Sequence, residues 1–353
     1  MPQPAIDNYR FETGVYRPPS EGGSCSLLVR FTRNCPWNRC SFCTMYKSEK
    51  FEVRPVEEIR QDIDAMAAIC NDLQSISRKL GHGGAIVQQA AVTLITQVPE
   101  LNYHQGFVMV YNWLLAGART VFLQDANSLI MKTDQLVEAL QYLRHTFPSI
   151  QRVTSYARSK TLMQKSIGEL TAIYKAGLDR LHVGLETGDD ALLKRIKKGV
   201  TAEAHIKGGR KALQAGFQLS EYWMPGLGGK SMLADHAVNT AKVLNAINPH
   251  YIRSRPFYPI PGTPMYTEVQ NRTFELVSAE ELLLELKKMI SALDVTSRVC
   301  FDHAGNFWKN RSGGLLFSHA YEGYKFPEEK EVVLALIDEG LNAKNRRPDL
   351  LNL

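Results

Sequence analysis

The residues best suited to chemistry are three cysteines within nine positions, Cys35, Cys40 and Cys43, spaced C-x4-C-x2-C. Grouped thiolates are suited to soft metals and to iron–sulfur clusters. A closed zinc site or an electron-transfer cluster normally has four protein ligands, whereas three cysteines leave one iron open to a substrate or cofactor. Zinc with a histidine as fourth ligand is the alternative, but no histidine lies nearer than His82. The spacing therefore predicts an iron–sulfur cluster with one open iron.

Composition favours a folded, cytoplasmic protein. The chain has 353 residues, 44% of them hydrophobic, which is enough for one large or two small cores. Outside the trio, Cys25, Cys70 and Cys300 are scattered, and this sparse usage is typical of a reducing compartment. Residues 1–10 lack an apolar signal core, and no run is long enough to span a membrane. The net charge is +6 without a dense Lys/Arg run, so nucleic acid is not indicated as a partner.

The elements that must position the cysteines form a βα rhythm. A buried strand is predicted over residues 24–32, directly before the cysteine loop, and reactive loops of α/β proteins follow strands in this way. Later strands recur about every 30 residues, the length of a βαβ unit. They are expected at 120–124, 152–156, 180–185, 217–223 and 251–255. Right-handed crossovers then build a parallel sheet, and the spacing alone allows either a barrel or a flat doubly wound sheet.

Helices are expected between and after these strands. Apolar residues at steps of three and four predict a helix from residue 56 to 80. Residues 85–116 are expected to be helices broken at Pro99 and Gly106, inserted before the second strand. Capping-box patterns predict helix starts at Ser166 and Ser278. We expect an irregular segment over 296–326 and a last helix over 328–341.

The cysteine loop resembles that of radical S-adenosylmethionine (radical SAM) enzymes, whose usual spacing is C-x3-C-x2-C with an aromatic before the last cysteine. Here Phe42 is that aromatic, and the first gap is one residue longer. Residues 119–264 resemble the subgroup with oxygen-independent coproporphyrinogen oxidase, the Elongator-type domain and the methylthiotransferases. The matching motifs are HVGLETG (182–188) with LKRIKKG (193–199), PGLGG (225–229) and PIPGTP (259–264).

The resemblance implies an α/β fold, a partial (β/α)6 TIM-like barrel with a helical insertion and a C-terminal helical extension. Residues 1–264 would form the core barrel, with 56–118 as the helical segment and insertion, and 265–353 would cover it. It also implies a [4Fe–4S] cluster on the three cysteines, whose open iron chelates S-adenosylmethionine. One electron, from a donor such as flavodoxin or ferredoxin, would release a 5′-deoxyadenosyl radical that abstracts hydrogen from an unidentified small molecule, under little oxygen.

The resemblance further implies cofactor contacts from successive strands. Asp125, with Gln124, stands where the family has a glycine-rich stretch that binds the methionyl amine. Lys198 either pairs with the methionyl carboxylate or lies on a solvated helix face beside Lys194. The remaining candidates are Phe42 for the adenine, Ser155, Tyr156 and Glu186 for the ribose, and Glu221 on a strand face with apolar neighbours.

Substrate residues are expected from the sixth strand and the segment 300–308. Arg253 and Arg255 share one strand face and favour an anionic substrate, although either could simply close an ion pair. In 300–308, aromatics would exclude water and polar residues would hold the substrate. We predict catalytic roles there for Asp302, His303 and Cys300, the last as a hydrogen-atom donor, and a substrate contact from Asn306.

Two other functions remain open. A non-catalytic, haem-binding relative of coproporphyrinogen oxidase would keep the same fold. An RNA-modifying enzyme is the second alternative. Methylthiotransferases need a second cysteine trio, and only Cys25, Cys70 and Cys300 remain for it. An active radical SAM enzyme acting on a small molecule is the leading interpretation.

Overall fold

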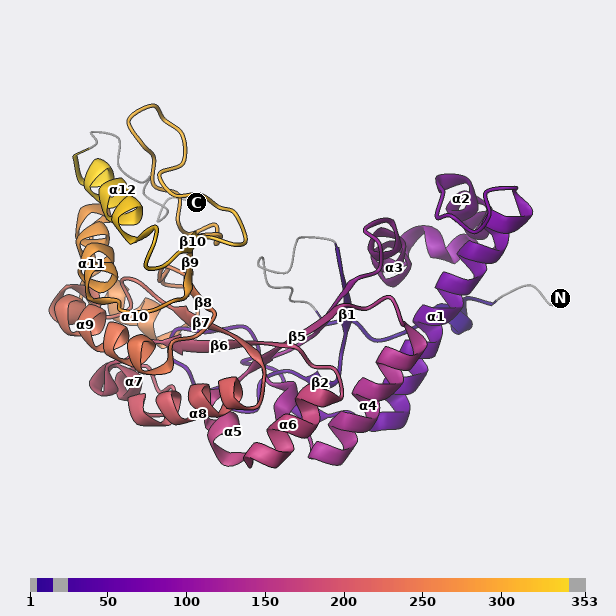
Figure 1. Ribbon diagram of the computed structural model, residues 1–353, viewed down its shortest axis with the longest axis horizontal. Helices are drawn as coiled ribbons and strands as arrows, with labels where there is room; N and C mark the ends of the chain where they lie inside the picture. Colours follow the sequence, from indigo (N-terminus) through magenta and orange to yellow (C-terminus); the bar gives the residue numbers. More distant parts are fainter. Residues whose placement is uncertain (1–4, 15–24, 343–353) are drawn as a thin grey trace. The chain divides into compact units, whose positions relative to one another are not determined.

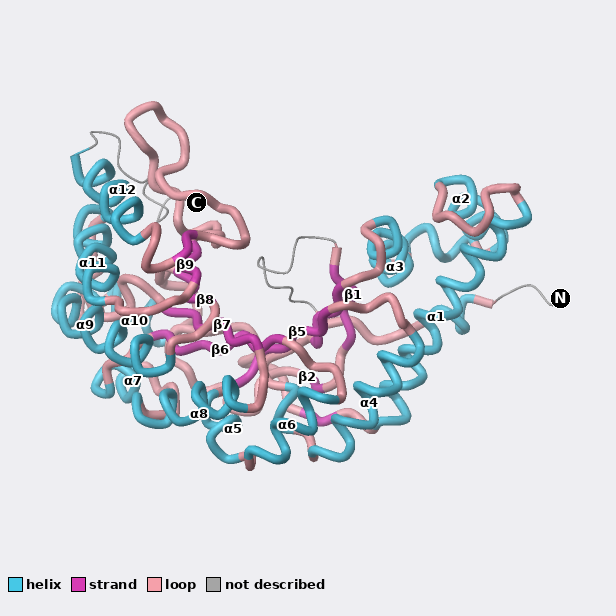
Figure 2. Tube along the Cα trace, in the orientation of Figure 1, coloured by secondary structure: helices cyan, strands magenta, loops and turns pink. Residues whose placement is uncertain are grey.

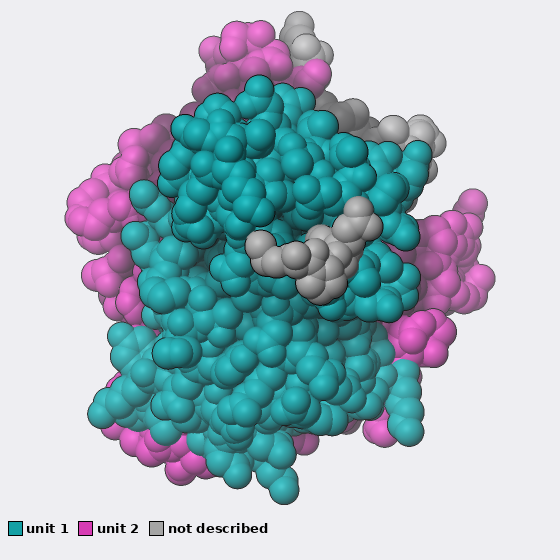
Figure 3. Space-filling view, turned by 90° about the vertical axis from the view of Figure 1, so that its right-hand side faces the viewer, with its two compact units in different colours: residues 1–35, 50–156, 171–180 teal, residues 36–49, 157–170, 181–353 magenta. Residues whose placement is uncertain are grey.

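The structure is a computed structural model that describes residues 5–14 and 25–342. It divides into two compact units, coloured separately in Figure 3. Unit 1 comprises residues 1–35, 50–156 and 171–180, and unit 2 comprises residues 36–49, 157–170 and 181–353. Each unit is described by itself below. The predicted boundary at residue 264 stays a prediction.

Unit 1 is built on parallel strands that follow one another in the sequence. Leu28 pairs with Phe122, and Phe122 pairs with Thr154, in register. A short antiparallel pair follows the first strand and precedes the long helix α1. The strands are β1 (Ser26–Val29), β2 (Thr32–Arg33), β3 (Glu52–Val53), β4 (Thr120–Leu123) and β5 (Arg152–Ala157).

The helices of unit 1 include the predicted insertion before β4. They are η1 (Ile6–Tyr9), α1 (Val56–Lys79), α2 (Gln88–Gln97), η3 (Pro99–Tyr103), α3 (Gln105–Leu115), η4 (Ser128–Ile130) and α4 (Thr133–Thr146). Pro99 does open a new element, as predicted. The predicted break at Gly106 is wrong, because Gly106 lies inside α3. A side chain there would come within 2.6 Å of the Phe11 ring, so the glycine permits close packing instead.

Unit 2 continues the strand–helix alternation. Its strands are β6 (Arg180–Glu186), β7 (Gln218–Trp223), β8 (Tyr251–Ser254), β9 (Arg298–Cys300) and β10 (Tyr324–Lys325), in that order across the sheet. Its helices are α5 (Ser159–Gln164), α7 (Asp190–Arg195), α8 (Ala202–Gln214), α9 (Gly229–Ile247), α10 (Pro264–Gln270), α11 (Ala279–Ala292) and α12 (Lys330–Asn342), while α6 (Ile167–Lys175) has residues in both units. Helices α8, α9 and α11 lie along one face of these strands (Figures 1 and 2).

Two sequence predictions about the C-terminal region have opposite outcomes. The Ser278 capping box is confirmed, with Ser278 and Glu281 bonded reciprocally at the start of α11. The prediction that residues 296–326 are irregular is wrong in part. Strand β9 extends the parallel strands beside β8, and β10 pairs with it in the antiparallel direction. Strands of three and two residues are too short to show an alternating pattern, so only the pairing of β9 with β8 and of β10 with β9 reveals them.

The α/β fold class is confirmed. All six predicted strands are present, as β1 and β4 to β8, and the strands of each unit are parallel except for the short β2–β3 and β9–β10 pairs. Within the described residues, no helix combines the length and apolarity that a bilayer crossing requires.

Candidate functional site

The cysteine loop is anchored firmly in unit 2 from Pro36 onward. Backbone bonds join Ser41 N to Ile196 O at 3.0 Å and Met265 N to Ser41 O at 3.1 Å. The Trp37 Nε1 atom donates to Lys197 O at 2.7 Å. Phe42 packs against an apolar cluster in the segments that follow α7, β7 and β8, composed of Leu192, Ile196, Met224, Leu227, Phe257, Met265 and Phe274. The loop therefore lies against segments that follow the carboxyl ends of the strands of unit 2.

None of the six cysteines forms a disulfide, and those of the trio are half-buried. Burial raises the pKa of Cys40, while the nearby Lys198 ammonium acts in the opposite direction. Cys35 belongs to unit 1, whereas Cys40 and Cys43 belong to unit 2. Among the described residues, the structure gathers no three His, Cys, Asp or Glu side chains into a metal site. The three-cysteine cluster site thus stays a prediction.

Lys198 and Glu186 form the charged centre of the site in unit 2. The Lys198 Nζ atom lies 2.7 Å from Glu186 Oε1, and the two side chains are 13% and 12% exposed. Burial by itself lowers the pKa of Lys198, but Glu186 and Cys40 raise it above its usual value, so the ammonium is retained. The solvated-face alternative for Lys198 is wrong. Only Lys194 and Lys197 of this run are exposed.

The backbone beneath this ion pair has no room for a side chain. A Cβ atom at Gly184 would lie 2.2 Å from Glu186 Oε1 and 2.9 Å from Lys198 Nζ. Glu186 itself adopts a φ of 62°, which turns its side chain at the end of β6. The glycine in the HVGLETG motif therefore makes space for the pair, a requirement that the sequence pattern alone did not explain.

Glu221 is a buried carboxyl, 1% exposed, and neither oxygen has a hydrogen-bond partner among the described residues. Burial raises the pKa of Glu221 well above its usual value, with Lys198 and Glu186 close enough to act on it. Strand alternation places it on the face of β7 that also carries Trp223, and Trp223 contacts His236 of α9. Glu221 therefore lies on the helix-covered face, and its cofactor role stays a prediction.

Gln124 and Asp125 each form hydrogen bonds with other segments of unit 1, and Asp125 binds the residue before the first cysteine. The Asp125 carboxylate accepts hydrogen bonds from Arg30 Nε at 2.6 Å and from the backbone N–H of Asn34, next to Cys35, at 3.0 Å. Gln124 exchanges hydrogen bonds with the backbone of Gly14 at 2.7 and 2.8 Å. Asp125 is thus already engaged in positioning the residue before the first cysteine, and a contact with the methionyl amine stays a prediction.

Ser155 and Tyr156 lie at the end of β5, in unit 1. Ser155 is fully buried, and its hydroxyl donates to Tyr156 O at 3.0 Å. The Tyr156 ring meets Phe122 edge to face at 5.3 Å. Since the other cofactor candidates Phe42, Glu186, Lys198 and Glu221 belong to unit 2, convergence of the two sets on one cofactor stays a prediction.

Arg253 forms the second polar centre of unit 2. Its Nη1 atom donates to Asp302 Oδ2 at 2.7 Å and to Tyr321 O at 3.2 Å, and its Nε atom donates to Ser220 Oγ at 3.2 Å. The guanidinium lies over the rings of Tyr251 and Tyr321, at 5.0 and 4.3 Å from their centroids. Its Nη2 atom has no hydrogen-bond partner among the described residues. Arg253 therefore forms an ion pair, and its contact with a substrate stays a prediction.

The other predicted substrate residues surround this centre. Cys300 lies beside Arg253 in the parallel register, and burial raises the pKa of its thiol to about 12. Asn306 is fully buried and bonds Ser254 through both ends of its amide. Burial, aided by the charges of Arg255 and His319, lowers the pKa of His303 to about 4, so its ring is neutral at pH 7. The structure thus brings the predicted residues of β8 and the segment 300–308 together.

Sequence reasoning missed the two tyrosines at Arg253. Tyr251 lies two residues before Arg253 on the same face of β8, so strand alternation could have found it. Tyr321 follows 68 residues later in the chain and carries no local signal. The predicted aromatic cover of 300–308 packs partly on a later part of the chain, because Phe301 stacks on Phe317 with ring centroids 4.1 Å apart.

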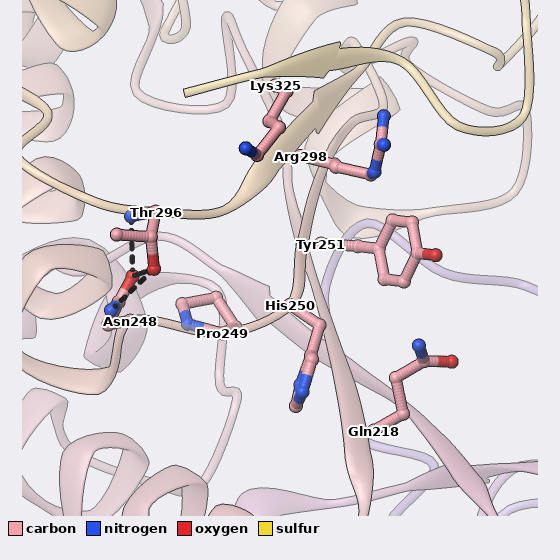
Figure 4. A pocket seen from close by; sticks show the side chains of 8 residues that line it. All are labelled: Gln218, Asn248, Pro249, His250, Tyr251, Thr296, Arg298 and Lys325. Carbon is pink, nitrogen blue, oxygen red and sulfur yellow. Dashed lines mark hydrogen bonds between the residues drawn. The ribbon is translucent and has the colours of Figure 1, made fainter. Parts of the chain in front are cut away.

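A small pocket in unit 2 lies at the opposite, amino ends of β7, β8 and β9 (Figure 4). Its volume is about 270 Å³, and Gln218, Tyr251 and Arg298 are among its lining residues. Its charged groups already have partners, since Arg298 pairs with Glu322 at 3.4 Å and Lys325 with Glu328 at 2.6 Å. The pocket therefore shares Tyr251 with the Arg253 centre, but none of the predicted site residues is among its lining residues.

Comparison with known proteins finds no matching family model and no matching curated protein. Similar solved structures include the archaeal Elp3 of Methanocaldococcus infernus, with 16% identity, a TM-score of 0.46, and coverage of 67% of this chain and 59% of that one. Methylornithine synthase matches with 15% identity, a TM-score of 0.44, and coverage of 78% and 65%. Coproporphyrinogen III oxidase from Escherichia coli, described as a radical SAM enzyme, matches with 12% identity, a TM-score of 0.44, and coverage of 77% and 54%.

The chain spans less than two thirds of the length of these solved structures. At such low identity and TM-score, the likeness does not by itself assign an activity to this chain.

Proposed function

We propose that the chain is a radical SAM enzyme that binds a [4Fe–4S] cluster through Cys35, Cys40 and Cys43 and acts on a small molecule. The observation that carries the proposal is a trio of cysteines outside any disulfide, in which Cys40 lies beside the half-buried Lys198–Glu186 pair. When bound, the cluster would supply the electron that cleaves S-adenosylmethionine into methionine and a 5′-deoxyadenosyl radical.

The residues of unit 2 suit a zwitterionic cofactor. Lys198 is a buried ammonium that could share its charge between Glu186 and the methionyl carboxylate, since an ammonium has three donors. The Glu186 carboxylate would then accept from a ribose hydroxyl. Phe42 already packs on an apolar cluster, which holds the aromatic in place for a ring contact. These donors, acceptors and apolar surfaces match the chemical groups of the cofactor and support the proposal.

Arg253 and its neighbours support a substrate with an anionic group. The Nη2 atom offers two N–H donors without an acceptor in the described part of the chain, and Tyr251 and Tyr321 hold the guanidinium plane. His303, neutral at pH 7, could donate or accept a hydrogen bond beside it. A cytoplasmic location is consistent with the sparse cysteines, and an electron-donor protein belongs to the same proposal.

The direct test is reductive cleavage of S-adenosylmethionine. Anaerobically reconstituted protein with dithionite should release 5′-deoxyadenosine slowly, even without its true substrate. The measurement is chromatography of the nucleoside products, with protein lacking iron as the control. Absence of the product together with tight haem binding would instead favour the haem-binding alternative.

Replacing Lys198 by alanine should weaken cofactor binding. The loss of one charge-assisted contact is worth about 1.5–3 kcal/mol, or roughly ten- to a hundredfold in the dissociation constant. Lys194→Ala, an exposed lysine four residues earlier, is the matched control and should bind normally. Equilibrium dialysis against S-adenosylmethionine measures both. Equal dissociation constants for the two variants would remove Lys198 from the cofactor site.

His303→Ala should separate substrate binding from the cluster. We expect it to keep its iron and the slow uncoupled release of 5′-deoxyadenosine, but to lose the stimulation that a small-molecule fraction of cell extract gives to the unchanged protein. The exposed neighbour Phe307→Ala should be stimulated normally. Loss of iron or of folding in His303→Ala would show that the histidine is structural.

A further inference from the structure

A group of cations surrounds the indole of Trp37 in the cysteine loop. The guanidinium carbons of Arg39 and Arg158 lie 5.1 and 4.9 Å from the ring centroid, and Lys160 Nζ lies 5.9 Å from it. Lys197 accepts the indole hydrogen bond through its backbone carbonyl. We call Trp37, Arg39, Arg158 and Lys160 the Trp37 patch; all four belong to unit 2.

Neighbouring residues hold the Trp37 ring and Arg158 in place. Gly199 leaves room for the ring, because a Cβ atom there would lie 2.2 Å from Trp37 Cζ2. The Arg158 Nη2 atom donates to Lys198 O at 2.8 Å, which ties the patch to the Lys198 segment. A cation over the face of a tryptophan is attracted by the negative charge density of the ring. The indole therefore collects several positive charges at one place on the loop.

Two of these charges lack a counter-ion. Arg39 and Lys160 make no ion pair with a carboxylate in the described parts of the chain. Arg39 is exposed, and Lys160 is half-buried. Unpaired cations gathered on one surface repel each other, so their free energy falls when an acidic surface covers them. The patch thus has the electrostatics of a docking site for an anionic partner.

The patch lies next to a predicted cluster ligand. Arg39 directly precedes Cys40 in the sequence, and Arg158 is hydrogen-bonded to the backbone of Lys198 at 2.8 Å. A partner seated on Trp37 would therefore approach the cysteine loop itself. This closeness matters for one kind of partner, a protein that delivers an electron.

We propose that the Trp37 patch is the docking surface for a small acidic electron-donor protein. The inference rests on the proposed function, since only a cluster on the cysteine loop needs an electron there. No bond is made in the step: the donor is oxidised by one electron and the cluster is reduced by one. RNA fits less well, because single-stranded bases bind on aromatic rings that are open for stacking, and Trp37 already carries three cations.

The test uses the full chain with a purified acidic flavodoxin as the probe. The variant Arg39→Glu with Lys160→Glu reverses two patch charges. The matched control, Lys242→Glu with Lys288→Glu, makes the same change in net charge at two exposed lysines of α9 and α11. Flavodoxin is titrated into each protein, with flavin fluorescence as the readout, at low and high salt. Dithionite-driven release of 5′-deoxyadenosine is measured in parallel.

We expect the patch variant to bind flavodoxin at least about tenfold more weakly than the control at low salt, with the difference shrinking as salt screens the charges. Both variants should keep the dithionite-driven reaction, because dithionite needs no docking surface. Equal binding by the two variants, or no binding by the unchanged protein, would overturn the proposal. If dithionite releases no product from any protein, the proposed function fails. The flavodoxin titrations still show whether the patch binds an acidic protein.

Discussion

Replacing any one of Cys35, Cys40 or Cys43 by alanine should abolish the bound iron of anaerobically reconstituted protein. The unchanged chain should hold about four irons and absorb broadly in the visible range. With only three protein ligands available, the loss of one leaves two, which is too few to hold a cluster against exchange. Iron content and the absorption spectrum measure the effect, which should be close to complete for each variant.

The remaining cysteines provide matched controls. Cys25 is exposed, and Cys70 and Cys300 are buried, so all three can be tested as alanine variants. Burial raises the pKa of both Cys70 and Cys300 to about 12, which keeps them as thiols rather than metal-binding thiolates. These variants should retain their iron. Iron loss from this second set, with the first set unaffected, would contradict the cluster assignment.

Replacing Arg253 by alanine should have the largest effect on stability. The side chains of Arg253 and Asp302 are 1% and 9% exposed, and they meet at 2.7 Å. Removing the guanidinium leaves the Asp302 carboxylate nearly buried without its cation, and broken pairs of this kind cost about 3–5 kcal/mol. The stacking on Tyr251 and Tyr321 is lost as well. Urea unfolding followed by circular dichroism measures the free energy of unfolding.

A double-mutant cycle separates the ion pair from the packing. Asp302→Ala removes the carboxylate, and the double variant should be less destabilised than the sum of the two single variants. Arg255→Ala is the control on the same strand end, because Arg255 is exposed, and its change should stay within about 0.5 kcal/mol. If Arg253→Ala unfolds at the same urea concentration as the Arg255 control, the Arg253 side chain does not stabilise the contact between β8 and the C-terminal segment.

Local chemistry was readable from the sequence wherever one segment contained the whole signal. The three cysteines, the capping boxes at Ser166 and Ser278, and the apolar period of α1 are patterns of neighbouring residues, and the structure confirms both caps and the helix. The six strands of the βα rhythm were predictable for the same reason. Each is a run of buried residues between helices of ordinary length.

Tertiary structure decided the contacts between residues that are far apart in the chain. Lys198 could have been a solvated lysine like its neighbours. Only the structure shows that it pairs with Glu186, next to Gly184. Arg253 meets Asp302 and Tyr321 from segments 49 and 68 residues away, and β9 exists only as a neighbour of β8. Such choices depend on burial and on the geometry of pairing, because a charge is stabilised in a low-dielectric interior only where the fold supplies its partner. The sequence determined which residues could do chemistry, and the fold determined which of them are buried, paired and held together.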